Sequence, residues 1–267
     1  MTVVDIEFSP ANTDWATLRE ATLAAEQRGY GAVFVFDHLA GVPLGGTTML
    51  ECFTLLGALA EVTSRVELGT MVANVWNRQV GTLVSAAASV AIMSGRQFHL
   101  GLGAGTSPGS TWAAEQHAVD AHLDVSLDAR HARVEAVLDL AARQWSAERD
   151  GQFATFPSPT PPPTRIVGVN SERLSRIAGQ LADGINVPWH HPHRDRFIAA
   201  ANDAAGERPF LRTAYSTYHR DLLDPGHPDR VEMTERRIDR LVLAVFDPLN
   251  VWLSDAVPVW APPDSTC

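Results

Sequence analysis

The chain has 267 residues, a formal net charge of −10, and 21 basic residues that are all arginines. An acidic surface argues against nonspecific binding to nucleic acid or to an anionic membrane. The absence of lysine excludes Schiff-base catalysis and the lysine of a Walker phosphate loop.

The first half of the chain alternates short apolar runs with helical patterns. It predicts a helix capped near Thr13, further helices over about residues 50–62 and 82–93, and strands over residues 3–8, 31–36, 66–72 and 97–101. Strand followed by helix, repeated in this way, is typical of a parallel sheet whose functional residues lie at the carboxyl ends of the strands.

The second half continues the pattern after a long connection over residues 102–128, in which we expect a short helix near residues 112–117. The clearest periodic helix ends at Trp145, and the proline-rich stretch 153–164 is interpreted as an ordered loop. Further strands are predicted over residues 165–169, 184–187, 210–214 and 241–246, with helices from Ser171 and over 194–204. The sequence after Pro248 is too short for a full last helix. We therefore predict an α/β fold, a (β/α)8 TIM barrel in a single domain over residues 1–267.

Two cysteines, Cys52 and Cys267, cannot form a disulfide framework or a cysteine metal site. Cys52 lies in an apolar helical stretch, where inert packing is expected, and Cys267 is expected in a loose tail. No apolar run approaches the ~18 residues of a membrane span, and no secretory signal is visible, so we expect a cytoplasmic protein.

Asp37 and His38 follow the second predicted strand. A barrel places catalytic residues at this position, and histidine exchanges protons near neutral pH. A histidine that completes a hydrogen-bond network at the barrel mouth fits the pair equally well.

Glycines alternate along the run from Gly101 to Gly105, where the fourth predicted strand ends. The run does not fit the dinucleotide-binding motif G-x-G-x-x-G, because Thr106 stands where its last glycine should be, and it lacks the lysine of a Walker phosphate loop. A tight barrel turn explains it, as does close approach of a ligand to the backbone. Asn170 and Ser171 lead into a helix; Ser171 is a good N-cap, and free amides there favour a phosphate, with Arg173 and Arg176 nearby.

Three histidines, His190, His191 and His193, follow the sixth strand. Pro192 interrupts them, so we favour loop histidines over a zinc site, with His191 placed to reach the pocket. His99 is expected in the core. The sequence contains no G-x-S-x-G elbow, and nucleophilic hydrolysis is not supported.

Together these motifs resemble the luciferase-like monooxygenase superfamily, and within it the oxidoreductases that depend on coenzyme F420. The resemblance runs from Gly31 to about Gly105 and again from Pro162 to Val187. It implies a (β/α)8 barrel, commonly a homodimer, with the cofactor ring at the carboxyl end of the strands.

Carried over by position, the resemblance implies that His38 faces the reactive ring and that Asp37 holds its orientation. Met71 and Val72 match a bulge, often with a non-proline cis peptide, behind the ring. The cofactor-binding residues implied in this way are Met71, Val72, Asn74, Ala104, Gly105, Thr106, Gly168, Asn170 and Ser171. Thr106 stands where some relatives have a catalytic glutamate, and Arg96 is displaced by one position from the usual pattern.

We therefore expect an oxidoreductase that transfers a hydride between coenzyme F420 and a small organic substrate, with His38 as proton donor or acceptor. The alternatives are a two-component monooxygenase that uses FMN and a non-catalytic flavin-binding barrel; a metal-dependent hydrolase fits least well. No long insertion separates the last two strands, which favours the deazaflavin, because an oxygen intermediate needs protection from water.

Overall fold

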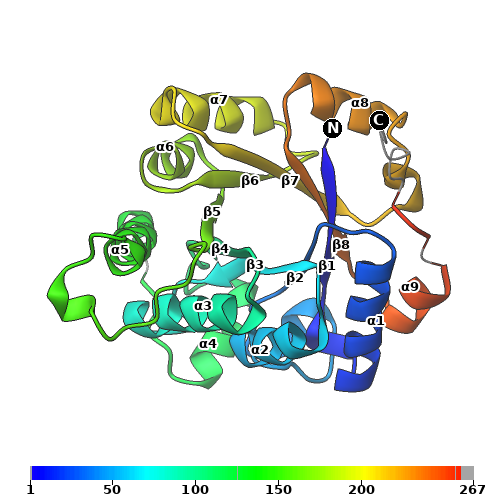
Figure 1. Cartoon of the computed structure of the whole chain (residues 1–267), viewed down its shortest axis with the longest axis horizontal. Helices are drawn as coiled ribbons and strands as arrows, with labels where there is room; N and C mark the ends of the chain where they lie inside the picture. Colours follow the sequence, from blue (N-terminus) through cyan, green and yellow to red (C-terminus); the bar gives the residue numbers. More distant parts are fainter. Residues whose placement is uncertain (1, 125, 256, 260–267) are drawn as a thin grey trace.

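A computed structural model describes residues 2–124, 126–255 and 257–259. Eight parallel strands form a closed barrel in the order β1 to β8, and helices lie around its outside (Figure 1). The strands are β1 (Val3–Phe8), β2 (Ala32–Val35), β3 (Glu67–Asn74), β4 (Phe98–Gly103), β5 (Thr164–Gly168), β6 (Gly184–Pro188), β7 (Leu211–Thr217) and β8 (Arg240–Val245). The predicted (β/α)8 fold is confirmed.

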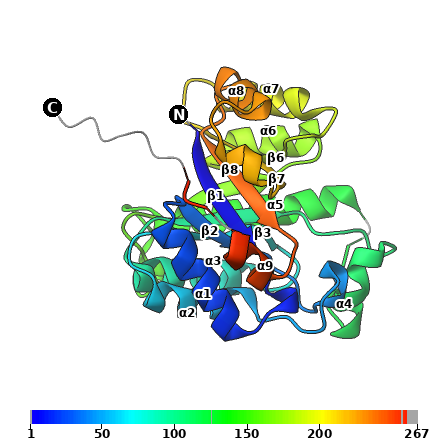
Figure 2. The same ribbon diagram turned by 90° about the vertical axis from the view of Figure 1, so that its right-hand side faces the viewer.

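The helices have the following bounds: α1 (Trp15–Gln27), α2 (Cys52–Val62), α3 (Val80–Ser94), α4 (Ala114–Ala118), α5 (Leu127–Trp145), α6 (Glu172–Leu181), α7 (Arg194–Ala205), α8 (Pro228–Glu235) and α9 (Leu249–Asp255). Figure 2 shows α4 at the end of the barrel toward which β1 and β8 run. This short helix lies within the long connection after β4, as predicted, and it brings a side chain over the barrel mouth.

The core has two parts, because the strands of a parallel barrel are buried on both faces. The larger part lies between strands and helices, where side chains such as Leu18, Leu56 and Val137 are fully buried. The smaller part fills the barrel interior with Ala32, Phe34, Met71, Ile166 and Val242.

Several boundaries differ from the prediction. Helix α1 is capped by Asp14, whose side chain accepts a hydrogen bond from Thr17 N, and not by Thr13. Strand β7 continues three residues beyond Ala214 because it pairs with β8 as far as Thr217. A short final helix, α9, does form, and its Trp252 packs edge-on against Phe8 at 4.9 Å.

Cys52 is buried, as expected for inert packing, whereas Cys267 lies outside the described residues. Among the described helices, none has both the length and the apolar character needed to cross a membrane.

Candidate active site

A cavity of about 530 Å³ opens at the carboxyl end of the barrel. This size is ordinary for a small-molecule site. Ten of the eleven predicted site residues line it: Asp37, His38, Met71, Val72, Asn74, Ala104, Gly105, Thr106, Gly168 and Asn170. Ser171 is not among the lining residues. The structure thus brings together segments from β2, β3, β4 and β5 that are far apart in the sequence.

Strand β3 is irregular at the predicted position. The peptide bond between Met71 and Val72 is cis, and the pairing with β4 shifts register between Thr70 and Ala73. The expected bulge or cis peptide is therefore confirmed. Val72, on the C-terminal side of this bond, lines the cavity.

The alternating glycines of β4 make room for β3 itself. A Cβ at Gly101 would lie 2.2 Å from Thr70 O, and one at Gly103 would lie 2.6 Å from Val72 Cγ2. On β5, a Cβ at Gly168 would lie 3.0 Å from Val72 Cγ1. The glycines therefore leave room for the irregular strand β3 and for Val72. The atoms that approach Gly101, Gly103 and Gly168 most closely belong to β3 itself.

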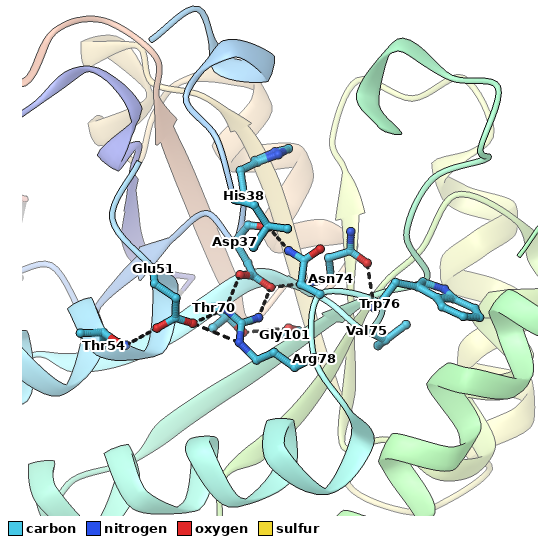
Figure 3. A network of polar contacts seen from close by, with 12 residues as sticks. Asp37, His38, Glu51, Thr54, Thr70, Asn74, Val75, Trp76, Arg78 and Gly101 are labelled. Atoms are coloured by element: carbon cyan, nitrogen blue, oxygen red, sulfur yellow. Dashed lines mark hydrogen bonds and ion pairs between the residues drawn. The ribbon is translucent and has the colours of Figure 1, made fainter. Parts of the chain in front are cut away.

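Asp37 does not orient His38, contrary to expectation. Its buried carboxylate accepts two hydrogen bonds from Arg78, at 2.7 and 2.8 Å, and one from the backbone N–H of Asn74 at 2.9 Å. Figure 3 shows the His38 ring pointing away from this carboxylate. Neighbouring residues at a strand end project in opposite directions, so adjacency in the sequence did not imply contact.

Arg78 joins the ends of β2 and β3 and was missed as a site residue. Besides Asp37 it contacts Glu51, and its guanidinium lies 4.9 Å from the centre of the Phe53 ring. Burial alone would lower the pKa of Arg78, but the two carboxylates outweigh it and raise that pKa above its ordinary value. The charge on Asp37 is therefore balanced behind the cavity wall.

The partner of His38 is Glu115, on α4. Glu115 Oε1 lies 2.9 Å from His38 Nδ1, while Oε2 accepts hydrogen bonds from the backbone N–H groups of Leu39 at 2.8 Å and Ala40 at 3.0 Å. Gln116 also donates to Oε1 at 2.9 Å. One carboxylate thus fixes both the histidine ring and the loop that carries it.

The electrostatics of Glu115 identify the donor in this pair. Burial would raise the pKa of Glu115, but the hydrogen bonds from His38, Ala40 and Leu39 outweigh burial and hold the pKa below its ordinary value. An ionised carboxylate can only accept, so His38 Nδ1 carries the proton. The other ring nitrogen, Nε2, forms no hydrogen bond within the described part of the chain and belongs to a side chain that lines the cavity.

The turn before α6 has the predicted cap. Ser171 Oγ accepts a hydrogen bond from Leu174 N at 3.3 Å. The nearby arginines are engaged elsewhere: Arg173 contacts Asp128, and Arg176 pairs with Glu172 at 3.1 Å. Any anion at this turn would therefore depend mainly on the first backbone amides of the helix.

The other histidines lie outside the cavity. His191 Nδ1 accepts a hydrogen bond from His193 N at 3.1 Å. Contrary to the prediction, His191 is not among the residues that line the cavity. His99 is buried and its Nε2 lies 2.8 Å from Glu67 Oε2. Within the described ranges, no three or more histidine, cysteine, aspartate or glutamate side chains gather as a metal site would require.

Residues 2–209 match the family described as luciferase-like monooxygenase. The chain belongs to the luciferase-like monooxygenase family. The match covers every strand from β1 to β6 and so includes all the cavity segments discussed above.

The chain is similar to enzymes whose names refer to coenzyme F420 or to methylenetetrahydromethanopterin. The chain is 28% identical over 250 residues to an F420-dependent glucose-6-phosphate dehydrogenase of Nakamurella multipartita, covering 88% of this chain and 62% of that enzyme. It is 26% identical over 209 residues to a 5,10-methylenetetrahydromethanopterin reductase of Methanolobus tindarius, covering 76% of this chain and 59% of that enzyme. The chain thus spans about three fifths of these enzymes.

The barrel also resembles a solved F420-dependent secondary alcohol dehydrogenase in complex with an F420–acetone adduct. The TM-score is 0.70 at 15% identity, and the alignment covers 98% of this chain and 100% of the other. At this identity the likeness supports the fold.

Proposed function

We propose that this chain is an oxidoreductase that transfers a hydride between coenzyme F420 and a small organic substrate, with His38 exchanging the accompanying proton. The observation that carries the proposal is the hydrogen bond just after β2, in which Glu115 holds His38 Nδ1 at 2.9 Å beside the cavity. The similarity to a protein named as an F420-dependent glucose-6-phosphate dehydrogenase supports the choice of cofactor.

The residues present fit a deazaflavin. Val72 offers an apolar surface to the cavity, and the missing side chains at Gly103 and Gly168 are what allow it to lie there. Asn74 adds a polar edge, and its side-chain Oδ1 accepts a hydrogen bond from Trp76 N at 3.0 Å. We propose that the ring would lie against Met71, Val72, Asn74, Ala104, Gly105, Thr106, Gly168 and Asn170, with phosphate near Ser171. When bound, the deazaflavin would supply the hydride-transfer chemistry that no side chain performs.

His38 is suited to the proton because its two ring nitrogens have different environments. Nδ1 donates to Glu115, so Nε2 is the acceptor in the neutral ring. During oxidation of an alcohol, Nε2 takes the hydroxyl proton, and the negative charge of Glu115 stabilises the imidazolium. During reduction the same group gives the proton back.

Replacing His38 with glutamine tests this function. The wild type and the variant are each incubated in the absence of oxygen with oxidised F420 and a panel of small alcohols, and with reduced F420 and the matching ketones, and turnover is measured. We expect His38→Gln to keep its cofactor affinity and melting temperature but to lower turnover by about 10²–10⁴-fold, the usual contribution of general acid–base catalysis. Turnover near that of the wild type would assign the proton to another group. A variant that does not fold would instead indicate a structural histidine.

A further inference from the structure

Glu7 is an acidic side chain in the barrel interior that the proposed reaction does not use. It lies one residue before the end of β1 and lines the cavity, and it is 2% exposed. Its Oε1 has no hydrogen-bond partner among the described residues. Barrel interiors are normally filled by branched apolar side chains, and a buried polar atom without a partner costs about 1–3 kcal/mol. This carboxyl group therefore needs an explanation.

No basic group among the described residues stabilises a charge on Glu7. Burial raises the pKa of its carboxyl well above the ordinary value, and no arginine or histidine offsets this effect. The other titratable group close to it on the cavity wall is Tyr215, whose pKa is raised by burial and by the proximity of Glu7. A carboxyl group in such surroundings is neutral over a wider pH range, and a neutral carboxyl can both donate and accept a hydrogen bond.

A second unpartnered polar group lines the same cavity. Asn186 on β6 is 3% exposed and also lines the cavity, and its Oδ1 has no partner within the described ranges. Asn186 pairs in register with Thr213 of β7, whose buried Oγ1 is likewise unpartnered. Strands β1 and β6 thus each place an unpartnered polar atom at the cavity, and β7 carries a third in register with Asn186. The residues proposed to hold the cofactor ring come from β3, β4 and β5, so Glu7 and Asn186 are left for the substrate.

The described lining of the cavity contains no arginine that could bind an anionic group of the substrate. The lining residues include the carboxyl groups of Glu7, Asp37 and Glu115, and no arginine among the described residues lines it. Asp37 is neutralised from behind by Arg78, and Glu115 is paired with His38. A phosphate or carboxylate of the substrate would find no free cation here.

We propose that Glu7 and Asn186 form a hydrogen-bonding subsite inside the barrel that binds a neutral hydroxyl or carbonyl group of the substrate and discriminates against phosphorylated substrates. The proposal rests on the proposed function because it concerns the same cavity. Glu7 donates a hydrogen bond to the substrate oxygen, and the side-chain Oδ1 of Asn186 accepts one from a substrate hydroxyl. The subsite sets specificity, while His38 exchanges the proton.

The test uses two variants of Glu7 and a matched control. Glu7→Gln keeps a neutral group that donates and accepts, whereas Glu7→Leu removes both functions. The control, Glu232→Gln, changes a carboxylate on α8 that pairs with Arg194 and Arg236 and is not among the residues that line the cavity. Binding of cyclohexanol, D-glucose and D-glucose 6-phosphate is measured by calorimetry on the protein with and without F420. The Kd for F420 is measured separately by fluorescence.

We expect the wild type to bind at least one neutral probe and to bind D-glucose 6-phosphate more weakly than D-glucose. Glu7→Leu should weaken binding of the neutral probe by roughly ten- to 100-fold, as expected for a lost buried hydrogen bond. Glu7→Gln and Glu232→Gln should stay within a few-fold of the wild type, and all should keep the Kd for F420.

Three results would overturn the subsite: no neutral probe binds the wild type, the phosphorylated sugar binds more tightly, or Glu7→Leu binds the neutral probe unchanged. Loss of F420 affinity in Glu7→Leu without loss of probe binding would assign the subsite to the cofactor ring and also overturn the proposal. Failure of the wild type to bind F420 would instead contradict the proposed function, since the binding of the neutral probes is measured without the cofactor as well.

Discussion

Replacing Glu115 with glutamine should separate the positioning of His38 from the stability of the barrel mouth. Glutamine has the same shape but one acceptor oxygen. If that oxygen keeps the N–H groups of Leu39 and Ala40, now 2.8 and 3.0 Å from Glu115 Oε2, its NH₂ group faces His38 Nδ1. The ring must then carry its proton on Nε2, and the imidazolium loses its anionic partner.

The expected size of the effect follows from the lost bond. A hydrogen bond to a charged group contributes about 1.5–3 kcal/mol, and about 1.4 kcal/mol is a factor of ten in rate, so turnover should fall roughly ten- to 150-fold. The KM-against-kcat split is measured beside Glu232→Gln, and the loss in Glu115→Gln should appear mainly in kcat, whereas Glu232→Gln should change neither constant. A kcat in Glu115→Gln equal to that of the wild type would refute the positioning role.

The same variant should show a pH-dependent difference in stability. The folded pKa of Glu115 lies below its ordinary value of 4.5, so its ionisation stabilises the fold above that pH, and the contribution is lost as the pH falls through the folded pKa. The gap in melting temperature between the wild type and Glu115→Gln should therefore close in acid. A gap that is constant with pH would contradict this reasoning.

Three further changes give distinct outcomes. Ser171→Asp keeps a good N-cap but should repel phosphate, so the melting temperature should hold while F420 affinity falls at least about tenfold; unchanged affinity in a fluorescence titration would place the phosphate elsewhere. Gly103→Ala puts a methyl 2.6 Å from Val72 Cγ2 and should cost about 1–3 kcal/mol in urea unfolding, with recovery when Val72→Ala is added; no recovery would contradict the contact. Burial raises the pKa of Glu7 in the folded state, so protonated Glu7 contributes its full stability below the ordinary pKa of 4.5, and this contribution is lost as the pH rises toward the folded pKa. The melting temperature of Glu7→Gln relative to the wild type should therefore increase with pH. A constant difference would argue against a neutral Glu7.

The fold and the strand-end segments could be predicted from the sequence because local signals mark them. Apolar runs that end in polar or glycine-rich segments identified the strands, and the irregularity at Met71 and Val72 was predicted from a family resemblance. The cap at Ser171 followed from its residue type and position.

The partners of the site residues could not be predicted in the same way. Glu115 is 77 positions from His38 in the sequence, within a connection that has no strong periodicity. Arg78 is 41 positions from Asp37, and no sequence pattern connects the two. Glu7 lies on a strand buried on both faces, where alternation does not tell interior from exterior. These contacts depend on barrel closure, which juxtaposes residues that no local pattern connects.

The most direct test of the central claim is a paired titration of the purified protein with F420 and with FMN, each in its oxidised and reduced form, followed by fluorescence. We predict that F420 binds with a Kd at least about tenfold below that of FMN and that His38→Gln leaves the Kd for F420 unchanged. Tighter binding of FMN would contradict the assignment to the F420-dependent oxidoreductases and favour a flavin monooxygenase, and binding of neither cofactor would contradict the proposed cofactor site.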